Sequence, residues 1–130
     1  MGNRKQMNGW IIHKKSLGEN FEVDRLVEEF KKQGVDIRVV NPKEVDIFVD
    51  RDDRKSIIVG GIPRKLPDFV LPRTGSGTTY FIKAIIRHME RLGVVMINGS
   101  ESIDAVKDKL YSQQILGQSN LPVPKTMLVK

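Results

Sequence analysis

The residues best suited to chemistry lie in one short stretch, residues 72–77 (PRTGSG). Gly75 and Gly77 permit a tight turn and let the backbone approach a ligand closely. Arg73 comes just before them and supplies a fixed cation for an anionic substrate. Ligands of open α/β sheets bind outside the carboxyl ends of the strands, so a loop that follows a strand is the right place for such a cation. The alternative is a structural turn with a surface arginine, because an isolated glycine motif is weak evidence.

The flanking residues predict a strand before this loop and a helix after it. Residues 69–71 form an apolar run typical of a buried parallel strand. Pro72 should end that strand, because proline has no N–H to donate to a sheet ladder. Thr78 or Thr79 can cap the helix that follows, at residues 79–92. Its wide apolar stripe indicates packing on the sheet rather than a cofactor site.

The first part of the chain predicts a strand–helix–strand unit. We expect strands at residues 9–13 and 35–40 and an amphipathic helix at residues 20–33. Asn20 is the expected helix cap, and Gly34 is the expected left-handed residue that ends the helix. Two strands joined in this way should be parallel, with a right-handed crossover.

Shorter elements complete the pattern. Two β segments, at residues 46–49 and 56–59, should form a small hairpin around the charged run at residues 50–55. A further strand is expected at residues 94–97, followed by a helix at residues 101–116. Asn98 or Ser100 is the expected cap of this last helix and Gly117 its expected stop; these caps follow from residue type alone.

Together these elements predict an α/β fold with an open, mostly parallel sheet flanked by helices. We expect one domain at residues 7–120, after a disordered tail at residues 1–6. Residues 121–130 begin with Leu-Pro-Val-Pro, which is rigid and extended, and end in a strand-like segment without a later partner. We therefore expect them to be a linker and the first strand of a further domain that is missing from this chain.

Composition limits the classes of function. The chain has 130 residues, no cysteine and a formal charge of +6. The lack of cysteine excludes disulfides and thiolate metal sites and is typical of a cytoplasmic protein. No apolar run approaches the roughly 18 residues of a membrane span, so we expect no membrane partner. The positive charge could attract nucleic acid, but the basic residues are scattered in pairs without an aromatic stacking platform.

No catalytic residue or metal site is expected within the chain. Asp50, Asp52 and Asp53 have the spacing of a metal-binding loop, but no glutamate completes it. His13 and His88 lie outside any nucleophile motif. We expect His88 at the surface or boundary of its helix.

A series of spaced motifs covers about half of the chain: Leu66-Pro67-Asp68, Pro72-Arg73-Thr74-Gly75, Glu90-Arg91-Leu92-Gly93, Ile97-Asn98, Ile103, Asp108-Lys109 and Leu121-Pro122-Val123-Pro124-Lys125-Thr126. In order and spacing this series resembles the ATP-grasp ligases of the ribosomal-S6-modification type, the RimK-like glutamate ligases. The first 60 residues resemble them only in the strand–helix–strand pattern. The resemblance implies an N-terminal pre-ATP-grasp domain with a Rossmann-like sheet.

The resemblance also implies a reaction and a set of contacts. Such ligases join a carboxylate to an amine through an acyl phosphate, using ATP and magnesium. By resemblance Lys109 reaches an ATP phosphate, and a lysine suits that role because it is a mobile point charge. The loop with Arg73, Thr74 and Gly75 would face the catalytic cleft, where the guanidinium can bind the carboxylate of an amino acid or peptide. Asn98 is a further substrate-contact candidate, with a turn-fixing role as its alternative.

The resemblance places most of the ATP and magnesium site in domains that this chain does not contain. We therefore expect the parent ligase to be active and the isolated chain to be inactive. The expected partners are an amino acid, preferably glutamate, and a peptide or protein acceptor; homo-oligomer formation is open. Two alternatives remain: a stand-alone flavodoxin-like module that binds an anionic ligand or a protein, and a basic domain associated with nucleic acid.

Overall fold

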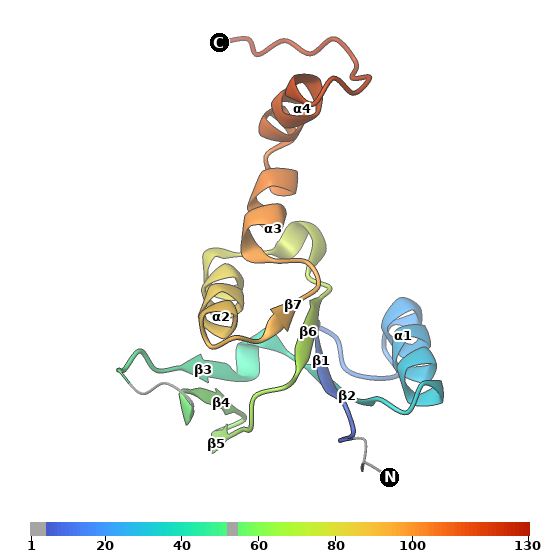
Figure 1. The fold of residues 1–130 in the computed structure, drawn as a ribbon, viewed down its shortest axis with the longest axis vertical. Coiled ribbons are helices and arrows are strands. Elements are labelled where there is room, and N and C mark those ends of the chain that lie inside the picture. Colours follow the sequence, from blue (N-terminus) through green and yellow to red (C-terminus); the bar gives the residue numbers. More distant parts are fainter. Residues whose placement is uncertain (1–4, 52–54) are drawn as a thin grey trace. The chain divides into compact units, whose positions relative to one another are not determined.

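The computed structural model describes residues 5–51 and 55–130 (Figure 1). The chain divides into two compact units, one ending at Ile97 and the other beginning at Asn98. The expected disordered tail falls largely on residues 1–4, which lie outside the described residues, as do residues 52–54 of the charged run.

The first unit is built on a four-stranded parallel sheet. Its strands are β1 (Asn8–Ile12), β2 (Asp36–Val40), β6 (Phe69–Pro72) and β7 (Val95–Met96), in the spatial order β2-β1-β6-β7. The central strand β1 pairs with β2 and β6, so that Ile11 lies opposite Val39 on one side and Leu71 on the other. The predicted open, parallel sheet is confirmed, and Pro72 ends its strand as expected.

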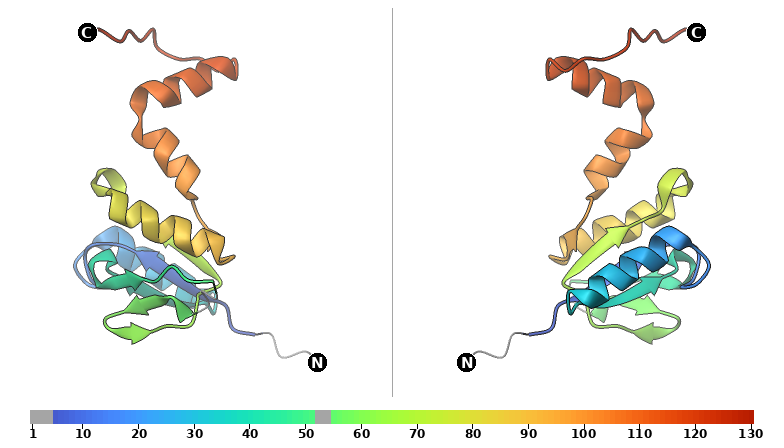
Figure 2. Two further views of the ribbon diagram at one scale, coloured as in Figure 1. Left: turned by 90° about the vertical axis from the view of Figure 1, so that its left-hand side faces the viewer. Right: turned by 90° about the vertical axis from the view of Figure 1, so that its right-hand side faces the viewer.

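Two helices cover opposite faces of this sheet. Helix α1 (Phe21–Lys32) connects β1 to β2, and helix α2 (Tyr80–Arg91) connects β6 to β7. In Figure 2, α2 lies in front of the sheet in the left view and α1 lies in front in the right view. The predicted caps are confirmed: the Asn20 side chain accepts from the backbone N–H of the residue three positions later, and Thr79 does the same for α2.

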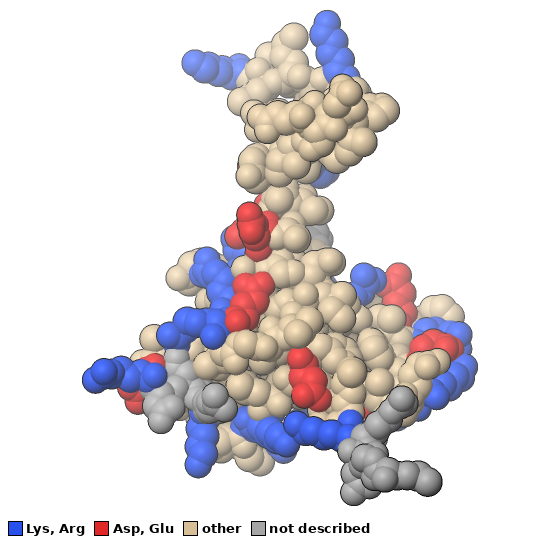
Figure 3. All heavy atoms as spheres, viewed as in Figure 1, with Lys and Arg blue, Asp and Glu red and all other residues tan. Residues whose placement is uncertain are grey.

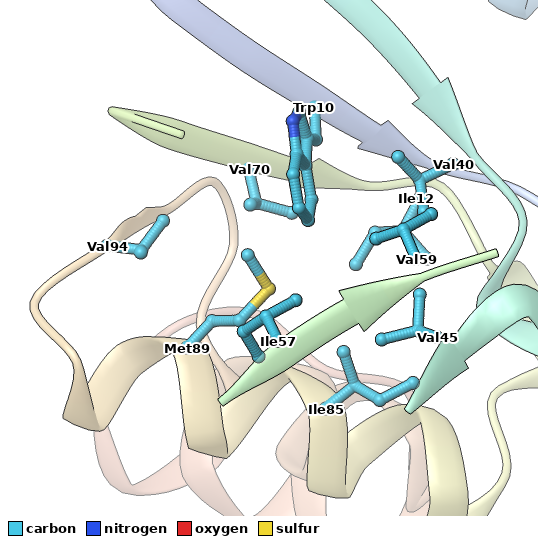
Figure 4. Packing of buried hydrophobic residues seen from close by; sticks show 10 residues of the cluster. All are labelled: Trp10, Ile12, Val40, Val45, Ile57, Val59, Val70, Ile85, Met89 and Val94. Carbon is cyan, nitrogen blue, oxygen red and sulfur yellow. The ribbon is translucent and has the colours of Figure 1, made fainter. Parts of the chain in front are cut away.

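The alternation of side chains along β1 divides the core between the two faces. Ile11 points to the α1 face and packs with Val23 and Val27. Trp10 and Ile12 point to the other face and join a larger cluster (Figure 4) that includes Ile85, Met89, Val45, Ile57, Val59, Val40, Val70 and Val94. Strand β1 is therefore buried on both faces, as a central strand of a parallel sheet should be.

A small antiparallel sheet completes the α2 face. It consists of β3 (Val45–Ile47), β4 (Ile57–Val59) and β5 (Ile62–Pro63), in that spatial order. A short 3-10 helix, η1 (Pro42–Glu44), leads into it. The predicted hairpin is present, but the prediction missed its third strand. Gly60 and Gly61 have φ values of +59° and +77° and turn the chain back, so that β5 pairs with β4.

The second unit contains α3 (Ser100–Lys107) and α4 (Lys109–Gln118). The single helix predicted at residues 101–116 is therefore wrong. Asp108 has an extended backbone (φ −86°, ψ 100°), and its carboxylate accepts from the backbone N–H of Tyr111, so it ends one helix and caps the next.

The residues predicted to begin and end the helical segment of this unit are also wrong. The N-cap of α3 is Gly99, without a side-chain hydrogen bond, rather than Asn98 or Ser100. Helix α4 continues past Gly117, and Asn120 takes the left-handed conformation with φ +57°. Residues 121–130 contain neither helix nor strand, and their assignment to a linker and a further domain stays a prediction. Across the described chain, no helix has both the length and the apolar character needed to cross a bilayer.

Gly9 is required in β1 because of its neighbour on β6. Gly9 pairs in register with Phe69, and a Cβ at position 9 would overlap the Phe69 ring. That ring is buried and also packs against Phe30 of α1, with ring centroids 5.4 Å apart. Phe69 therefore has the strand on one side and the helix on the other, with little room to move.

We predict that Gly9→Ala destabilises the fold by about 1–3 kcal/mol, the usual cost of overpacking a core. Gly117→Ala is the matched control, because its added methyl would meet only Val123 Cγ2 at 3.9 Å; within helix α4 it should be neutral or stabilise by up to about 1 kcal/mol. Urea unfolding measures both. An unchanged midpoint for Gly9→Ala would show that Phe69 can move aside.

Candidate functional site

The sheet has a topological switch point between β1 and β6. The connection after β1 passes through α1 on one face, and the connection after β6 passes through α2 on the other. The carboxyl ends of these two neighbouring strands are where doubly wound folds bind ligands. Arg73 is held at this edge, because its backbone N–H donates to Ile12 O at 2.9 Å.

The glycine loop that follows β6 is closed by its own hydrogen bonds. Gly75 has φ +57° and begins the 3-10 turn η3 (Gly75–Gly77). The Thr78 hydroxyl donates to Gly75 O at 2.8 Å, and it lies 2.5 Å from the Thr74 hydroxyl. Since the Thr78 hydrogen is used, Thr74 must donate to Thr78. Thr74 can then offer a ligand only its acceptor lone pairs.

Arg73 does not stand alone at this edge. Its Nη2 lies 3.0 Å from Oε2 of Glu22, and the two side chains are 47% and 71% exposed. Glu22 is in the first turn of α1, where the helix dipole favours a carboxylate. An exposed ion pair of this kind contributes at most about 1 kcal/mol. An incoming carboxylate can therefore replace Glu22 at little cost.

A hollow of about 560 Å³ opens beside this ion pair. Leu71 and Leu26 supply apolar lining from β6 and α1, and Phe21, which is 78% exposed, lies at the start of the helix. Arg73 and Arg25 bring cations to the same hollow. Its remaining lining residues are the carboxylates Glu22 and Glu29. The hollow combines apolar surface with paired charges, which suits a small ligand with a carboxylate at one end.

Glu29, one of the two carboxylates of the hollow, belongs to a network of ion pairs on α1. Arg25 contacts Glu28 at 2.6 Å and Glu29 at 3.1 Å, and Lys32 contacts Glu29 at 2.8 Å. The hydrogen bond from Lys32, together with its charge, lowers the pKa of Glu29 below its ordinary value. The acidic groups on this helix face are thus matched by bases on the same face.

The other predicted site residues belong to the second unit. Asn98 is its first residue and is exposed. Lys109 is the first residue of α4, is exposed, and follows the capping residue Asp108. The structure therefore brings together Arg73, Thr74 and Gly75 in one loop and places Asn98 and Lys109 in a separate unit.

His88 is buried, which corrects the prediction that it lies at the surface or boundary. It is 6% exposed, and its Nε2 lies 2.7 Å from the hydroxyl of Ser56, which is 5% exposed. The small sheet covers this side of α2, and sequence reasoning could not place that sheet against the helix. A serine and a histidine at this distance could form a nucleophile and base. Their burial instead indicates a structural hydrogen bond, and it lowers the pKa of His88.

No group of three or more histidine, cysteine, aspartate or glutamate residues is placed to hold a metal among residues 5–51 and 55–130. The aspartate spacing considered as a metal loop rests on Asp52 and Asp53, which lie outside this range.

Comparison with known proteins identifies the family. Residues 10–103 match the family model described as the RimK PreATP-grasp domain. The chain belongs to this family. The match includes the Arg73 loop and Asn98, whereas Lys109 lies beyond it; the roles of all these residues stay predictions.

Curated relatives of this RimK pre-ATP-grasp chain carry ligase names. The Probable alpha-L-glutamate ligase of Legionella pneumophila (strain Corby) is 34% identical over 102 residues, which are 78% of this chain and 34% of the relative. The Probable alpha-L-glutamate ligase 2 of Shewanella sp. (strain W3-18-1) is 34% identical over 110 residues, or 83% of this chain and 36% of the relative. The chain thus spans about a third of the length of these relatives.

Solved structures support the same fold. The ATP-grasp ligase PsnB complexed with minimal precursor superposes with a TM-score of 0.68 at 16% identity, over 93% of this chain and 46% of that chain. PsnB complexed with precursor peptide PsnA2 and AMPPNP gives a TM-score of 0.66 at 14% identity, over 90% and 45%. At such identities the likeness establishes the fold alone, and it confirms the predicted pre-ATP-grasp architecture of the RimK family.

The buried His88 predicts a pH-dependent stability. Because the folded state lowers its pKa below the ordinary 6.5, the unfolded chain binds a proton first as the pH falls. The contribution of neutral His88 to the free energy of unfolding should be fully present above pH 6.5 and should decrease as the pH falls below 6.5. The urea midpoint should therefore be lower at pH 5.5 than at pH 7.5.

His88→Gln should be less stable than the parent chain at pH 7.5 but should lose most of this pH dependence. His13→Gln, at the carboxyl end of β1, is the control and should keep it. If His88→Gln retained the full decrease between pH 7.5 and 5.5, another group would be responsible.

Proposed function

We propose that the chain is the N-terminal domain of an ATP-dependent carboxylate–amine ligase that joins an amino acid, glutamate, to an acceptor through an acyl phosphate. The match of residues 10–103 to the RimK pre-ATP-grasp family carries this proposal. It is supported by relatives named as probable alpha-L-glutamate ligases, of which this chain spans about a third. The parent protein would supply the remaining domains.

In the proposed reaction a carboxylate oxygen attacks the γ-phosphorus of ATP, and ADP leaves. The amine then attacks the acyl carbon, phosphate leaves, and the amine loses a proton. ATP and magnesium supply the activation, and most of their contacts would come from the other domains. Lys109 is the residue of this chain that would bind an ATP phosphate. It suits that contact because its ammonium is exposed and has no hydrogen-bond or ion-pair partner among the described residues.

Arg73 would bind the carboxylate of the amino acid or of the acceptor. The Glu22 carboxylate already lies 3.0 Å from its guanidinium, and the substrate carboxylate would take the place of Glu22. A substrate that displaces Glu22 would place its remaining atoms in the adjoining hollow, against Leu71 and Leu26. Thr74 would accept from the amino group of the same ligand through its free lone pairs.

The division of labour predicts that the isolated chain neither hydrolyses ATP nor ligates glutamate in the presence of magnesium. The physical reason is that one lysine cannot supply the electrostatic stabilisation that phosphoryl transfer requires. Release of ADP, measured with a coupled assay, tests this prediction on the purified 130-residue chain. Turnover that depends on magnesium would contradict the assignment of the nucleotide site to other domains.

In the parent ligase, we predict that Lys109→Ala raises KM for ATP or lowers kcat. We predict that Arg73→Ala weakens binding of the amino acid or of the acceptor. Loss of a hydrogen bond to a charged group costs about 1.5–3 kcal/mol, or roughly ten- to a hundredfold. Steady-state kinetics in each substrate measures the effects. If both variants kept wild-type kinetic constants for every substrate, the assignment would be wrong and both residues would be ordinary surface charges.

Glu22→Gln is the matched variant for Arg73. It keeps the size of the side chain but removes the carboxylate that competes for the guanidinium. We expect Glu22→Gln to strengthen binding of the same substrate whose binding Arg73→Ala weakens, and to leave KM for ATP unchanged. Thermal unfolding of each variant separates these effects from a loss of fold. A Glu22→Gln variant that binds the same substrate more weakly would show that Glu22 itself contacts the ligand.

A further inference from the structure

A second hollow lies at the other end of β1, where the strands of the parallel sheet begin. Its volume is about 300 Å³. The first residues of β1 and β2 and the segment between β5 and β6 form its walls. Four residue steps of about 3.3 Å separate the two ends of β1, or roughly 13 Å, so this hollow is distinct from the one beside Arg73.

Three cations and one carboxylate line this second hollow. Arg38 comes from β2, and Arg64 and Lys65 come from the segment that leads into β6. Asp36, at the start of β2, is the carboxylate. Within the described chain none of the three cations forms an ion pair. The nearby Asp68 carboxylate is already used, because it accepts from the backbone N–H of Asn8 at 2.8 Å.

Figure 3 shows lysine and arginine side chains side by side along the lower edge of the first unit. The three cations that line the hollow repel one another, and a bound anion would reduce that repulsion. The excess of positive charge around this hollow therefore favours an acidic ligand.

Arg64 supplies an unused donor at this position. Its Nε is buried and has no hydrogen-bond partner among the described residues. Its backbone is fixed, because its N–H donates to Ile57 O at 3.0 Å. A buried donor without an acceptor is costly and uncommon in folded proteins. An acceptor that reaches this guanidinium would remove that cost.

Trp10 also lines this hollow. It is the only tryptophan of the chain and is 6% exposed. Figure 4 shows its indole nitrogen at the end of the ring away from Met89. No described residue accepts a hydrogen bond from that nitrogen. The hollow thus combines guanidinium forks and an ammonium with a tryptophan that can report on binding.

We propose that this hollow is an anion-binding site for a small molecule that carries a phosphate or two carboxylate groups. Arg64 and Arg38 bind the acidic oxygens through their guanidinium forks, which match the geometry of both groups. Lys65 adds a mobile charge. Asp36 limits the affinity for anions, because it repels them from the same wall. The site does not depend on the ligase function proposed for the Arg73 edge.

Fluorescence of Trp10 tests this site directly on the 130-residue chain. Inorganic phosphate and citrate are titrated separately, with chloride replacing them to keep the ionic strength constant. We expect a saturable change in the Trp10 emission. Saturation at a lower concentration of phosphate assigns a phosphate ligand, and saturation at a lower concentration of citrate assigns a carboxylate ligand. A response to both anions that equals the response to chloride would overturn the proposal.

Variants locate the binding. Arg64→Gln and Arg38→Gln should each lower the affinity for the titrated anion roughly tenfold or more. Asp36→Asn should raise that affinity roughly fivefold, since the substitution removes a negative charge that repels the anion. Lys43→Gln is the matched control, because it removes one charge beyond the carboxyl end of β2 and should leave the affinity within about twofold. Equal weakening by Lys43→Gln and Arg38→Gln would overturn the proposal.

Thermal unfolding accompanies each titration. Arg64 is partly buried, so Arg64→Gln can lose the fold for reasons unrelated to binding. Arg38 and Asp36 are both exposed, and their variants should keep the parent melting temperature. In that case the opposite signs expected for Arg38→Gln and Asp36→Asn decide the matter. An Asp36→Asn variant that binds phosphate and citrate no more tightly would overturn the proposal.

Discussion

Strand β1 is hydrogen-bonded on both edges and buried on both faces, and the rest of the first unit depends on it. Ile11 and Ile12 are 0% and 1% exposed, although they point in opposite directions. A strand that must satisfy β2, β6 and two helices at once leaves no freedom of register, because a slip of one residue would exchange its two apolar faces. The backbone positions at both of its ends are therefore fixed by pairing and packing, and the loops that extend from them start at defined points.

Much of this fold could be predicted, because the information is local. The apolar spacing of α1 and its cap at Asn20 depend on residues within one helix, and the parallel pairing follows from the strand–helix–strand order. The failures lie where a local pattern has two solutions. Residues 101–116 have helical composition throughout, but the carboxylate of Asp108 caps a new helix instead of continuing the old one. Only the assembled backbone decides between these states.

The candidate site divides in the same way. The position of Arg73 beyond a buried strand follows from Pro72 and the two glycines, so sequence reasoning found it. Its partner Glu22 is 51 residues away and meets it only because α1 packs beside β6. Burial of His88 likewise depends on a small sheet whose third strand was not foreseen. A charge pair or a buried polar pair between distant segments has no local signal, since each member alone resembles an ordinary surface residue.

The two ends of β1 differ in how their charges are balanced, and this difference bears on function. At the carboxyl end each arginine of the hollow has a carboxylate partner, as in Arg73–Glu22 and Arg25–Glu29. A ligand there must compete with an internal carboxylate, as the substrate proposed for this edge would. At the amino end Arg38 and Arg64 have no such partner among the described residues. A ligand there does not have to break an ion pair of these arginines, so the same guanidinium chemistry would bind it more tightly. Matched charges favour exchange and unmatched charges favour retention, because only the first arrangement restores an ion pair when the ligand departs.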